Sequence, residues 1–414
     1  MSENRKFYGW TLVAVLWVIY LLNMGFPLYG GSIINSYMLQ EIQMSRGTYG
    51  FAFTLLNIFV GVPAFIVAAC VSAIGARYTF MVGSALILLG GLSMSFLVKQ
   101  PWHYLMAFGG IIGAGIGFST IMPITTCITS WFKRYRGRAM GIAMTASGFG
   151  GFIASPLVNR FIAATGGNWR TAWLFIAGIA VVAGLIAYLL VRERPEDMGQ
   201  VPDGTIEDSS AVKSGLHTTY QWKPEEAYRT ASYWLIVVAA LGTFYPFFFM
   251  TAHWVLHLKG LGISPASAAW AMGLFTLASI GGRLLGGVLV DYLPARYVFI
   301  IGTCSTLVGS YIAIGASQLP LAIAAAILLG VGFGWNYVTQ STMIGNYFGP
   351  AAFPKLNGTL LTISHIIAVW SGLIAGNLYD AYKSYTPAFT IHILISLLAI
   401  VAIFFAKPPA KTNA

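Results

Sequence analysis

Charged residues are scarce in this sequence. Only 8% of the 414 residues are Asp, Glu, Lys or Arg, whereas 57% are hydrophobic. A soluble globular chain carries roughly 25% charged residues, so this composition excludes an ordinary water-soluble domain and indicates a polytopic membrane protein. The first apolar run follows MSENRKFYGW without an evident small-residue cleavage site, and we therefore expect a spanning helix there rather than a removable signal.

Cysteine is also scarce, and its positions exclude two kinds of site. Cys70, Cys127 and Cys304 fall in apolar runs far apart in the sequence, which suits neither a disulfide framework nor a metal site. The net charge of +11 forms no interleaved basic patch, so nucleic acid is not an expected partner. No nucleophile–base spacing, phosphate loop or metal-ligand cluster stands in the sequence. We expect no cofactor, no metal and no enzymatic activity.

Long apolar runs dominate what is present. A run of about 20 apolar residues spans a bilayer as a helix, and we predict twelve such helices. Their predicted extents are 9–36, 48–72, 78–98, 102–131, 139–163, 170–191, 232–257, 266–290, 297–316, 319–347, 354–379 and 385–406. The polar stretch between the sixth and seventh, about 192 to 231, holds eight of the twelve acidic residues. We therefore predict an all-α membrane protein with two six-helix halves, residues 1–191 and 232–414, joined by a cytoplasmic linker over 192–231.

The basic residues predict the orientation. With a cytoplasmic N-terminus, sixteen of the 23 Lys and Arg residues lie on the cytoplasmic side and five on the other. Short loops rich in Lys and Arg stay in the cytoplasm, so we expect both termini there and a location in the plasma (inner) membrane. The remaining two basic residues lie within predicted spans. Arg160 is near the outer end of its helix and can reach the surface, whereas Arg283 cannot easily do so.

The two halves contain a repeated stretch. VSAIGARY at residues 71–78 aligns with VDYLPARY at 290–297, and the same offset places Gly83 on Gly302 and Gly90 on Gly309. Transporter folds are often built from such repeats. The second copy, GVLVDYLPAR at 287–296, resembles the loop signature between helices two and three of each half in the major facilitator superfamily. This resemblance covers nearly the whole chain and implies transport by alternating access.

The resemblance also implies gating residues. In the family, the acid and basic residues of the signature hold the cytoplasmic ends of neighbouring helices together, which makes Asp291, Arg296 and Arg77 gating candidates. In the first copy Ser72 stands in place of the acid. We therefore expect any charge latch in that half to be weaker or built otherwise.

Within the superfamily, the closest resemblance is to the monocarboxylate and oxalate/formate transporter group. It is carried by GFPLYG at 25–30, WFKRYRGRAMG at 131–141, RPEDMG at 194–199 and the run over 264–283. The resemblance implies a secondary transporter of small organic monocarboxylate anions, coupled to protons, that works as a monomer in the lipid bilayer. A carboxylate anion exchanger is the main alternative. An exporter of neutral amphiphiles and a transporter-like solute sensor are further alternatives.

Arg283 is the principal substrate-binding candidate. A charge at this depth is costly, by roughly 3 kcal/mol on insertion scales, and the sequence has no Asp or Glu near the middle of a predicted span. A guanidinium grips a carboxylate through two parallel hydrogen bonds. Ser279 lies one turn earlier on the same face. In the resembled group an arginine of helix eight binds the substrate anion, and Arg283 matches its position; an arginine held for gating alone is the alternative.

Two histidines are proton-coupling candidates. His365 lies near the middle of the span over 354–379, where an imidazole titrating near neutral pH would carry a proton with the substrate. In oxalate carriers of the resembled group a lysine occupies about this place, and its absence here favours a monoanion. His253 is expected to face the outer vestibule. Ordinary helix packing is the alternative for both residues.

The remaining substrate-binding candidates are polar or aromatic residues of helices one, seven and ten. They are Asn23, Tyr29, Tyr245, Asn336 and Tyr337. A buried Tyr or Asn needs a polar partner, and a cavity supplies water or substrate, although helix–helix contact would serve as well. In the resembled group Tyr337 falls where a substrate-contacting tyrosine is expected. The stretch SGFGG at 147–151 is predicted to serve close helix packing.

Overall fold

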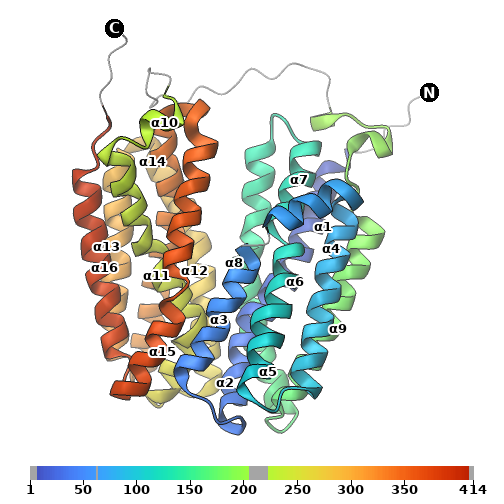
Figure 1. The fold of residues 1–414 in the computed structure, drawn as a ribbon, viewed down its shortest axis with the longest axis vertical. Coiled ribbons are helices and arrows are strands. Elements are labelled where there is room, and N and C mark those ends of the chain that lie inside the picture. Colours follow the sequence, from blue (N-terminus) through green and yellow to red (C-terminus); the bar gives the residue numbers. More distant parts are fainter. Residues whose placement is uncertain (1–6, 62–63, 205–221, 410–414) are drawn as a thin grey trace. The chain divides into compact units, whose positions relative to one another are not determined.

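The computed structural model describes residues 7–61, 64–204 and 222–409. Within these ranges every regular element is a helix (Figure 1). Eleven of the described helices are long and apolar enough to cross a membrane. The predicted all-α class is therefore confirmed.

The chain divides into two compact units. Unit 1 comprises Met1–Met44 and Leu55–Val212, and unit 2 comprises Ser45–Thr54 and Lys213–Ala414. The helix α3 (Arg46–Gly61) therefore contributes its first part to unit 2, although the sequence predicts these residues in the N-terminal half. The limits predicted for the two halves and the linker stay a prediction.

Unit 1 begins with one long apolar segment made of α1 (Gly9–Tyr20), η1 (Leu21–Gly30) and α2 (Gly31–Glu41). Its other elements, besides the end of α3, are α4 (Ala64–Phe96), α5 (Pro101–Tyr104), η2 (Leu105–Ile112), α6 (Gly113–Phe118), α7 (Ile121–Trp131), α8 (Arg136–Ala164), α9 (Trp169–Leu190), η3 (Pro195–Met198) and η4 (Pro202–Gly204). The helix α4 packs along α9, and α8 packs along α1 and η1.

The middle of the first segment is a π-helix that contains Pro27. Proline has no amide hydrogen and disturbs an α-helix, and a wider π-helical turn is one way to accommodate it. Beside it Gly25 meets Gly150 of α8 so closely that a Cβ on either residue would overlap the other backbone. The packing role predicted for SGFGG is therefore confirmed.

Unit 2 contains α10 (Pro224–Ala227), α11 (Ala231–Gly260), α12 (Pro265–Tyr292), α13 (Ala295–Ile314), α14 (Leu319–Ala368), α15 (Ser371–Tyr382) and α16 (Thr386–Phe405). The long helix α14 packs against α11, α12 and α13, while α11 also packs against α15 and α16. Within unit 2, α11 and α14 therefore each pack against several other helices.

Two glycines mark the ends of predicted spans. Gly75 interrupts α4 with φ 86° and ψ 164°, and Gly349 interrupts α14 with φ 76° and ψ 172°. Positive φ values of this size favour glycine because it lacks a Cβ. The predicted boundaries near 72–78 and 347–354 thus lie at these glycines. The predicted span over 48–72 is divided between α3 and the start of α4, with residues 62–63 outside the described part.

The repeat has a counterpart in the packing of each unit. In unit 1 a Cβ added to Gly115 of α6 would lie 2.8 Å from the carbonyl oxygen of Gly83 of α4. In unit 2 a Cβ added to Gly332 of α14 would lie 2.8 Å from the carbonyl oxygen of Gly302 of α13. Because the repeat aligns Gly83 with Gly302, the two units use the same close helix contact at the aligned positions.

Candidate functional site

The helix α12 carries Arg283 along a close contact with α14. Gly282 and Gly286 bring the backbone of α12 against Val331 and Trp335, because a Cβ on either glycine would crowd the α14 backbone. Helices approach this closely only where side chains are small. The contact fixes where the neighbouring Arg283 side chain emerges from α12.

Arg283 is half-buried and lies over two aromatic rings of α14. Its guanidinium carbon is 5.2 Å from the ring centroid of Tyr337 and 5.8 Å from that of Phe333. A guanidinium within about 6 Å of an aromatic ring is attracted to its electron-rich face. The two rings therefore hold the cation in a defined position.

The two rings belong to a larger aromatic cluster between α11 and α14, which consists of Phe244, Phe247, Phe248, Phe333 and Tyr337. Phe247 stacks on Phe333 with 4.2 Å between ring centroids and 13° between planes. Phe244 meets Tyr337 edge to face at 6.1 Å. Offset stacking and edge-to-face contacts are the favourable arrangements of aromatic pairs, so the cluster forms a fixed apolar wall beside Arg283.

His365 lies at the other end of this aromatic cluster. Its ring centroid is 4.1 Å from that of Phe244 and 5.6 Å from that of Phe248. Its Nδ1 lies 2.6 Å from the Leu361 carbonyl oxygen, and because a carbonyl only accepts, Nδ1 carries the hydrogen. In a neutral ring Nε2 then has a lone pair, and no hydrogen bond to Nε2 is found among the described residues. Arg283, Tyr337 and His365, three of the predicted site residues, are thus brought to one cluster.

The phenylalanines of α11 were not among the predicted site residues. Their signal in the sequence is the run FYPFFFM at 244–250, where bulky rings occupy every face of the helix. A run of this kind has no periodicity that would tell which ring faces the site. Only the packing of α11 against α14 selects Phe244, Phe247 and Phe248.

Three further candidates of unit 2 have contacts within the helix packing. Asn336 is fully buried, and with its amide turned it donates to the Phe299 carbonyl and accepts from the Thr303 hydroxyl, each at 3.0 Å. The Ser279 hydroxyl donates to the Thr276 carbonyl of its own helix at 2.6 Å. Tyr245 is buried with its ring 5.6 Å from that of His392. Their predicted part in substrate binding stays a prediction.

His253 is fully buried between α11, α15 and the start of α16. Its Nε2 lies 2.8 Å from the Gly372 carbonyl oxygen, so this nitrogen donates. Its Nδ1 lies 2.9 Å from the Tyr385 hydroxyl and accepts from it when the ring is neutral. Burial raises the pKa of Tyr385 above its usual value, which keeps the phenol protonated as a donor. Both ring nitrogens of His253 therefore have partners in the helix packing.

The candidates of the first helix lie in unit 1. Asn23 of η1 is fully buried and donates through Nδ2 to the Ser84 hydroxyl of α4 at 2.9 Å. Tyr29, also in η1, is buried with 3% of its surface exposed. Both residues belong to unit 1. Their contact with substrate stays a prediction.

The gating candidates differ between the two units. In unit 1 the Arg77 backbone amide donates to a carboxylate oxygen of Glu193 at 2.9 Å, and Arg77 Nε donates to the Val191 carbonyl at 3.1 Å. Glu193 thus brings a carboxylate to the repeat signature where Ser72 replaces the acid. In unit 2 Arg296 Nη2 donates to the Tyr297 hydroxyl at 2.8 Å. The side chain of Asp291 lies outside the described part.

The chain is similar to known proteins in both sequence and fold. The family model described as Major Facilitator Superfamily matches residues 15–260 and 235–414. An MFS-type transporter of Gibberella moniliformis is 24% identical over 352 residues, 83% of this chain and 77% of that protein. Monocarboxylate transporter 13 of Bos taurus is 26% identical over 337 residues, 77% of this chain and 70% of that protein. The crystal structure of a bacterial homologue of the human lysosomal transporter Spinster shares the fold, with a TM-score of 0.72, 14% identity and coverage of 98% and 97% of the two chains.

Proposed function

Because the chain belongs to the Major Facilitator Superfamily, and is thus a multi-pass membrane transporter rather than an enzyme, we propose that it carries small organic monocarboxylate anions. The carrier would be a secondary active transporter that works by alternating access between two six-helix halves. The similarity to a relative named monocarboxylate transporter 13 supports this substrate class.

One observation carries the proposal: a guanidinium on a membrane-spanning helix, held against two aromatic rings. Arg283 lies 5.2 Å from the Tyr337 ring centroid, and a guanidinium in general can pack its face on an aromatic ring while it donates hydrogen bonds in its own plane. Two parallel N–H groups match the two oxygens of a carboxylate. In our proposal Arg283 binds the carboxylate, Tyr337 orients it, and the aromatic cluster accepts the apolar end of the substrate.

The proposal also includes proton coupling. His365 donates from Nδ1 to its own helix, which leaves the lone pair of Nε2 to accept a proton from the aqueous side or from the acid. Protonation would add a second positive charge near the site and favour binding of the anion. Exchange against a second carboxylate is the alternative mechanism, and it predicts uptake that needs an internal anion but no pH gradient.

Two further parts of the proposal concern placement. We place both termini in the cytoplasm and the protein in the plasma (inner) membrane, because the loops assigned to that side hold most of the basic residues. We also propose that one chain suffices for transport. Cysteine-accessibility labelling at loop positions tests the orientation.

The decisive experiment is uptake of a labelled acid panel by proteoliposomes. Arg283→Gln should raise KM by about 30-fold or more, because the loss of one partner of a desolvated charge pair costs at least about 2 kcal/mol. Arg283→Lys should be intermediate, since it keeps the charge and loses the planar fork. Arg160→Gln is the matched control, because Arg160 is the other arginine within a predicted span and its side chain is exposed. Unchanged uptake by Arg283→Gln would refute the proposed site.

The same assay separates the alternatives. Proton coupling predicts uptake driven by an inwardly directed proton gradient with empty vesicles. Exchange predicts uptake only into vesicles preloaded with a carboxylate. An exporter of neutral amphiphiles would transport none of the acids, and a solute sensor would bind an acid without transporting it.

A further inference from the structure

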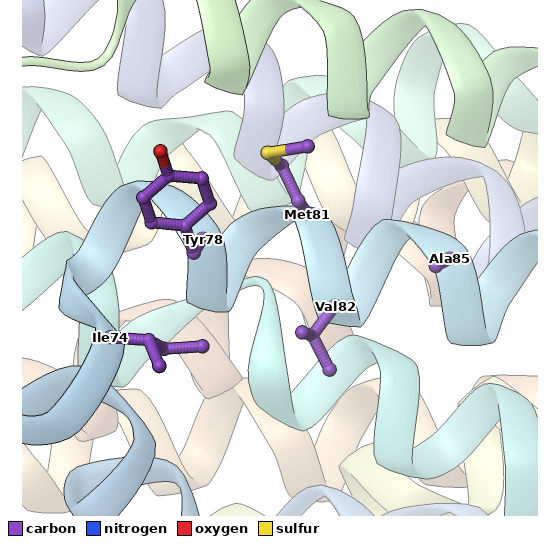
Figure 2. Close-up of a pocket in the computed structure, with 5 residues that line it drawn as sticks. All are labelled: Ile74, Tyr78, Met81, Val82 and Ala85. Carbon is purple, nitrogen blue, oxygen red and sulfur yellow. The ribbon is translucent and has the colours of Figure 1, made fainter.

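Unit 1 carries two adjoining apolar grooves on its exposed surface. The first, about 600 Å³, is lined by Ile74, Tyr78, Met81, Val82 and Ala85 along α4 (Figure 2). The second, about 270 Å³, lies between α4 and α9 and shares Met81 and Ala85 with the first. The two grooves therefore form one continuous strip, which we call the α4–α9 groove.

The length of the α4–α9 groove matches part of a lipid. It extends along α4 past the interruption at Gly75 as far as Leu88. The thirteen helical residues from 76 to 88 rise roughly 18 Å from first to last, and one leaflet of the hydrocarbon core is about 15 Å thick. Its lining is almost wholly apolar, so an acyl chain in one leaflet fits it from the membrane surface toward mid-depth.

Two arginines lie at one end of this groove. Arg77 Nε and Arg192 Nη1 donate to the same Val191 carbonyl oxygen, at 3.1 and 3.2 Å. The Arg77 guanidinium carbon is also 5.8 Å from the ring of Tyr188, which lines the groove. Neither arginine forms a salt bridge within 4 Å to a described carboxylate. The Glu193 carboxylate accepts from the Arg77 backbone amide at the same end, so two positive charges and one negative charge converge where the groove ends, with a positive balance.

Two tyrosines mark the same end as the level of the lipid headgroups. Tyr78 and Tyr188 line the groove, and each has 47% of its surface exposed. Tyrosine concentrates at the membrane–water interface because its ring is apolar and its hydroxyl is polar. In our proposed orientation this end faces the cytoplasm, where the leaflet carries anionic lipids that attract basic residues.

We propose that the α4–α9 groove binds an anionic phospholipid. The acyl chain lies along Met81, Ala85 and the facing residues of α9, and the phosphate lies at Arg77 and Arg192. The site is separate from the proposed carboxylate site, which belongs to unit 2. A lipid here would brace the interrupted end of α4, where Gly75 leaves the helix without continuous backbone hydrogen bonding.

Native mass spectrometry of the whole chain in detergent tests the proposal. The purified protein is titrated with phosphatidylglycerol and with phosphatidylcholine of the same acyl chains. Phosphatidylglycerol should bind at least about fivefold more tightly, the effect expected of one basic residue at an anionic surface. Equal binding of the two lipids would overturn the proposal, and so would displacement of phosphatidylglycerol by equimolar inorganic phosphate, which has no acyl chain.

Three variants locate the site. Ala85→Trp fills the groove from an exposed position and should reduce binding of phosphatidylglycerol, whereas Val182→Trp, at an exposed position of α9 outside the lining, should not. Arg192→Gln should lower the preference for phosphatidylglycerol about fivefold. This change keeps the Arg192 carbonyl that accepts from Trp131 Nε1 at 2.9 Å, so the fold should be preserved.

The outcomes of the variants are also decisive. Equal lipid binding by Ala85→Trp and Val182→Trp would place the lipid elsewhere and overturn the proposal. A wild-type dimer that Ala85→Trp converts to monomer would instead assign the groove to contact between two copies of the chain.

Discussion

Asp380 of α15 caps the first turn of α3 at Arg46. Its Oδ1 accepts a hydrogen bond from the Arg46 amide at 2.9 Å, and its Oδ2 accepts one from the Gly47 amide at 2.8 Å. The first amides of a helix have no acceptor within the helix and carry partial positive charge, so a carboxylate there is stabilising. Asp380 is thus one of the residues that hold 45–54 in unit 2.

Replacing Asp380 should weaken this attachment. Asp380→Ala should lower the free energy of unfolding by about 1–2 kcal/mol, the range for a lost helix cap with its charge, and Asp380→Asn should lower it less because the amide oxygen still accepts. Thermal unfolding in detergent measures both. Glu225→Gln is the control. It removes the ion pair between Glu225 and Lys355, whose side chains are 66% and 61% exposed, respectively, and it should change the free energy of unfolding little. Equal midpoints for Asp380→Ala and the control would contradict the capping role.

The packing of α3 on α15 should not tolerate a methyl group. A Cβ on Gly50 would overlap the Gly372 carbonyl oxygen and lie 2.7 Å from Nε2 of His253. We expect Gly50→Ala to lower the free energy of unfolding by about 1–3 kcal/mol, as overpacking does. Gly178→Ala, where a Cβ meets nothing within 4 Å, should instead be neutral or stabilising because alanine favours a helix. A Gly50→Ala protein as stable as Gly178→Ala would show that α3 is not held there.

The two proton-coupling candidates should separate experimentally. His365→Gln should flatten the pH dependence of uptake, because it removes the only predicted coupling imidazole beside the aromatic cluster. His253→Gln should lower the thermal midpoint and keep the pH profile, because both nitrogens of His253 are bonded to Gly372 and Tyr385. Uptake is measured over a series of buffers from about pH 5 to 8. The reverse pattern would assign coupling to His253.

Asn336 should affect stability more than substrate affinity. Its amide joins α14 to Phe299 and Thr303 of α13. Asn336→Ala removes these hydrogen bonds between the two helices, while the Thr303 hydroxyl still donates to the Phe299 carbonyl at 2.9 Å. We expect a loss of about 0.5–1.5 kcal/mol in the free energy of unfolding with KM for the acid unchanged. Thermal unfolding and uptake kinetics on the same preparation test this. A raised KM at unchanged stability would restore Asn336 to the substrate site.

The sequence alone determined the class of fold and the central residue of the site. Scarce charge and repeated apolar runs leave few structures other than a helical membrane protein, because buried backbone groups in lipid need internal hydrogen bonds. The sequence alone also aligns Gly83 with Gly302, and in each unit the aligned glycine lies where two helix backbones approach closely. Arg283 also stands out in the sequence, because a charge inside an apolar helix is costly unless it serves a function.

Tertiary structure decided which side chains meet. The carboxylate at Arg77 comes from Glu193, 116 positions away in the chain, and periodicity carries no information about such a distant contact. The phenylalanines of α11 became part of the site, and Asn336 became a link between helices, because helix packing selects which face of each helix is turned toward a neighbour. The attachment of residues 45–54 to unit 2 likewise depends on Asp380 and on Gly372, and local sequence has no means of specifying a partner so far along the chain.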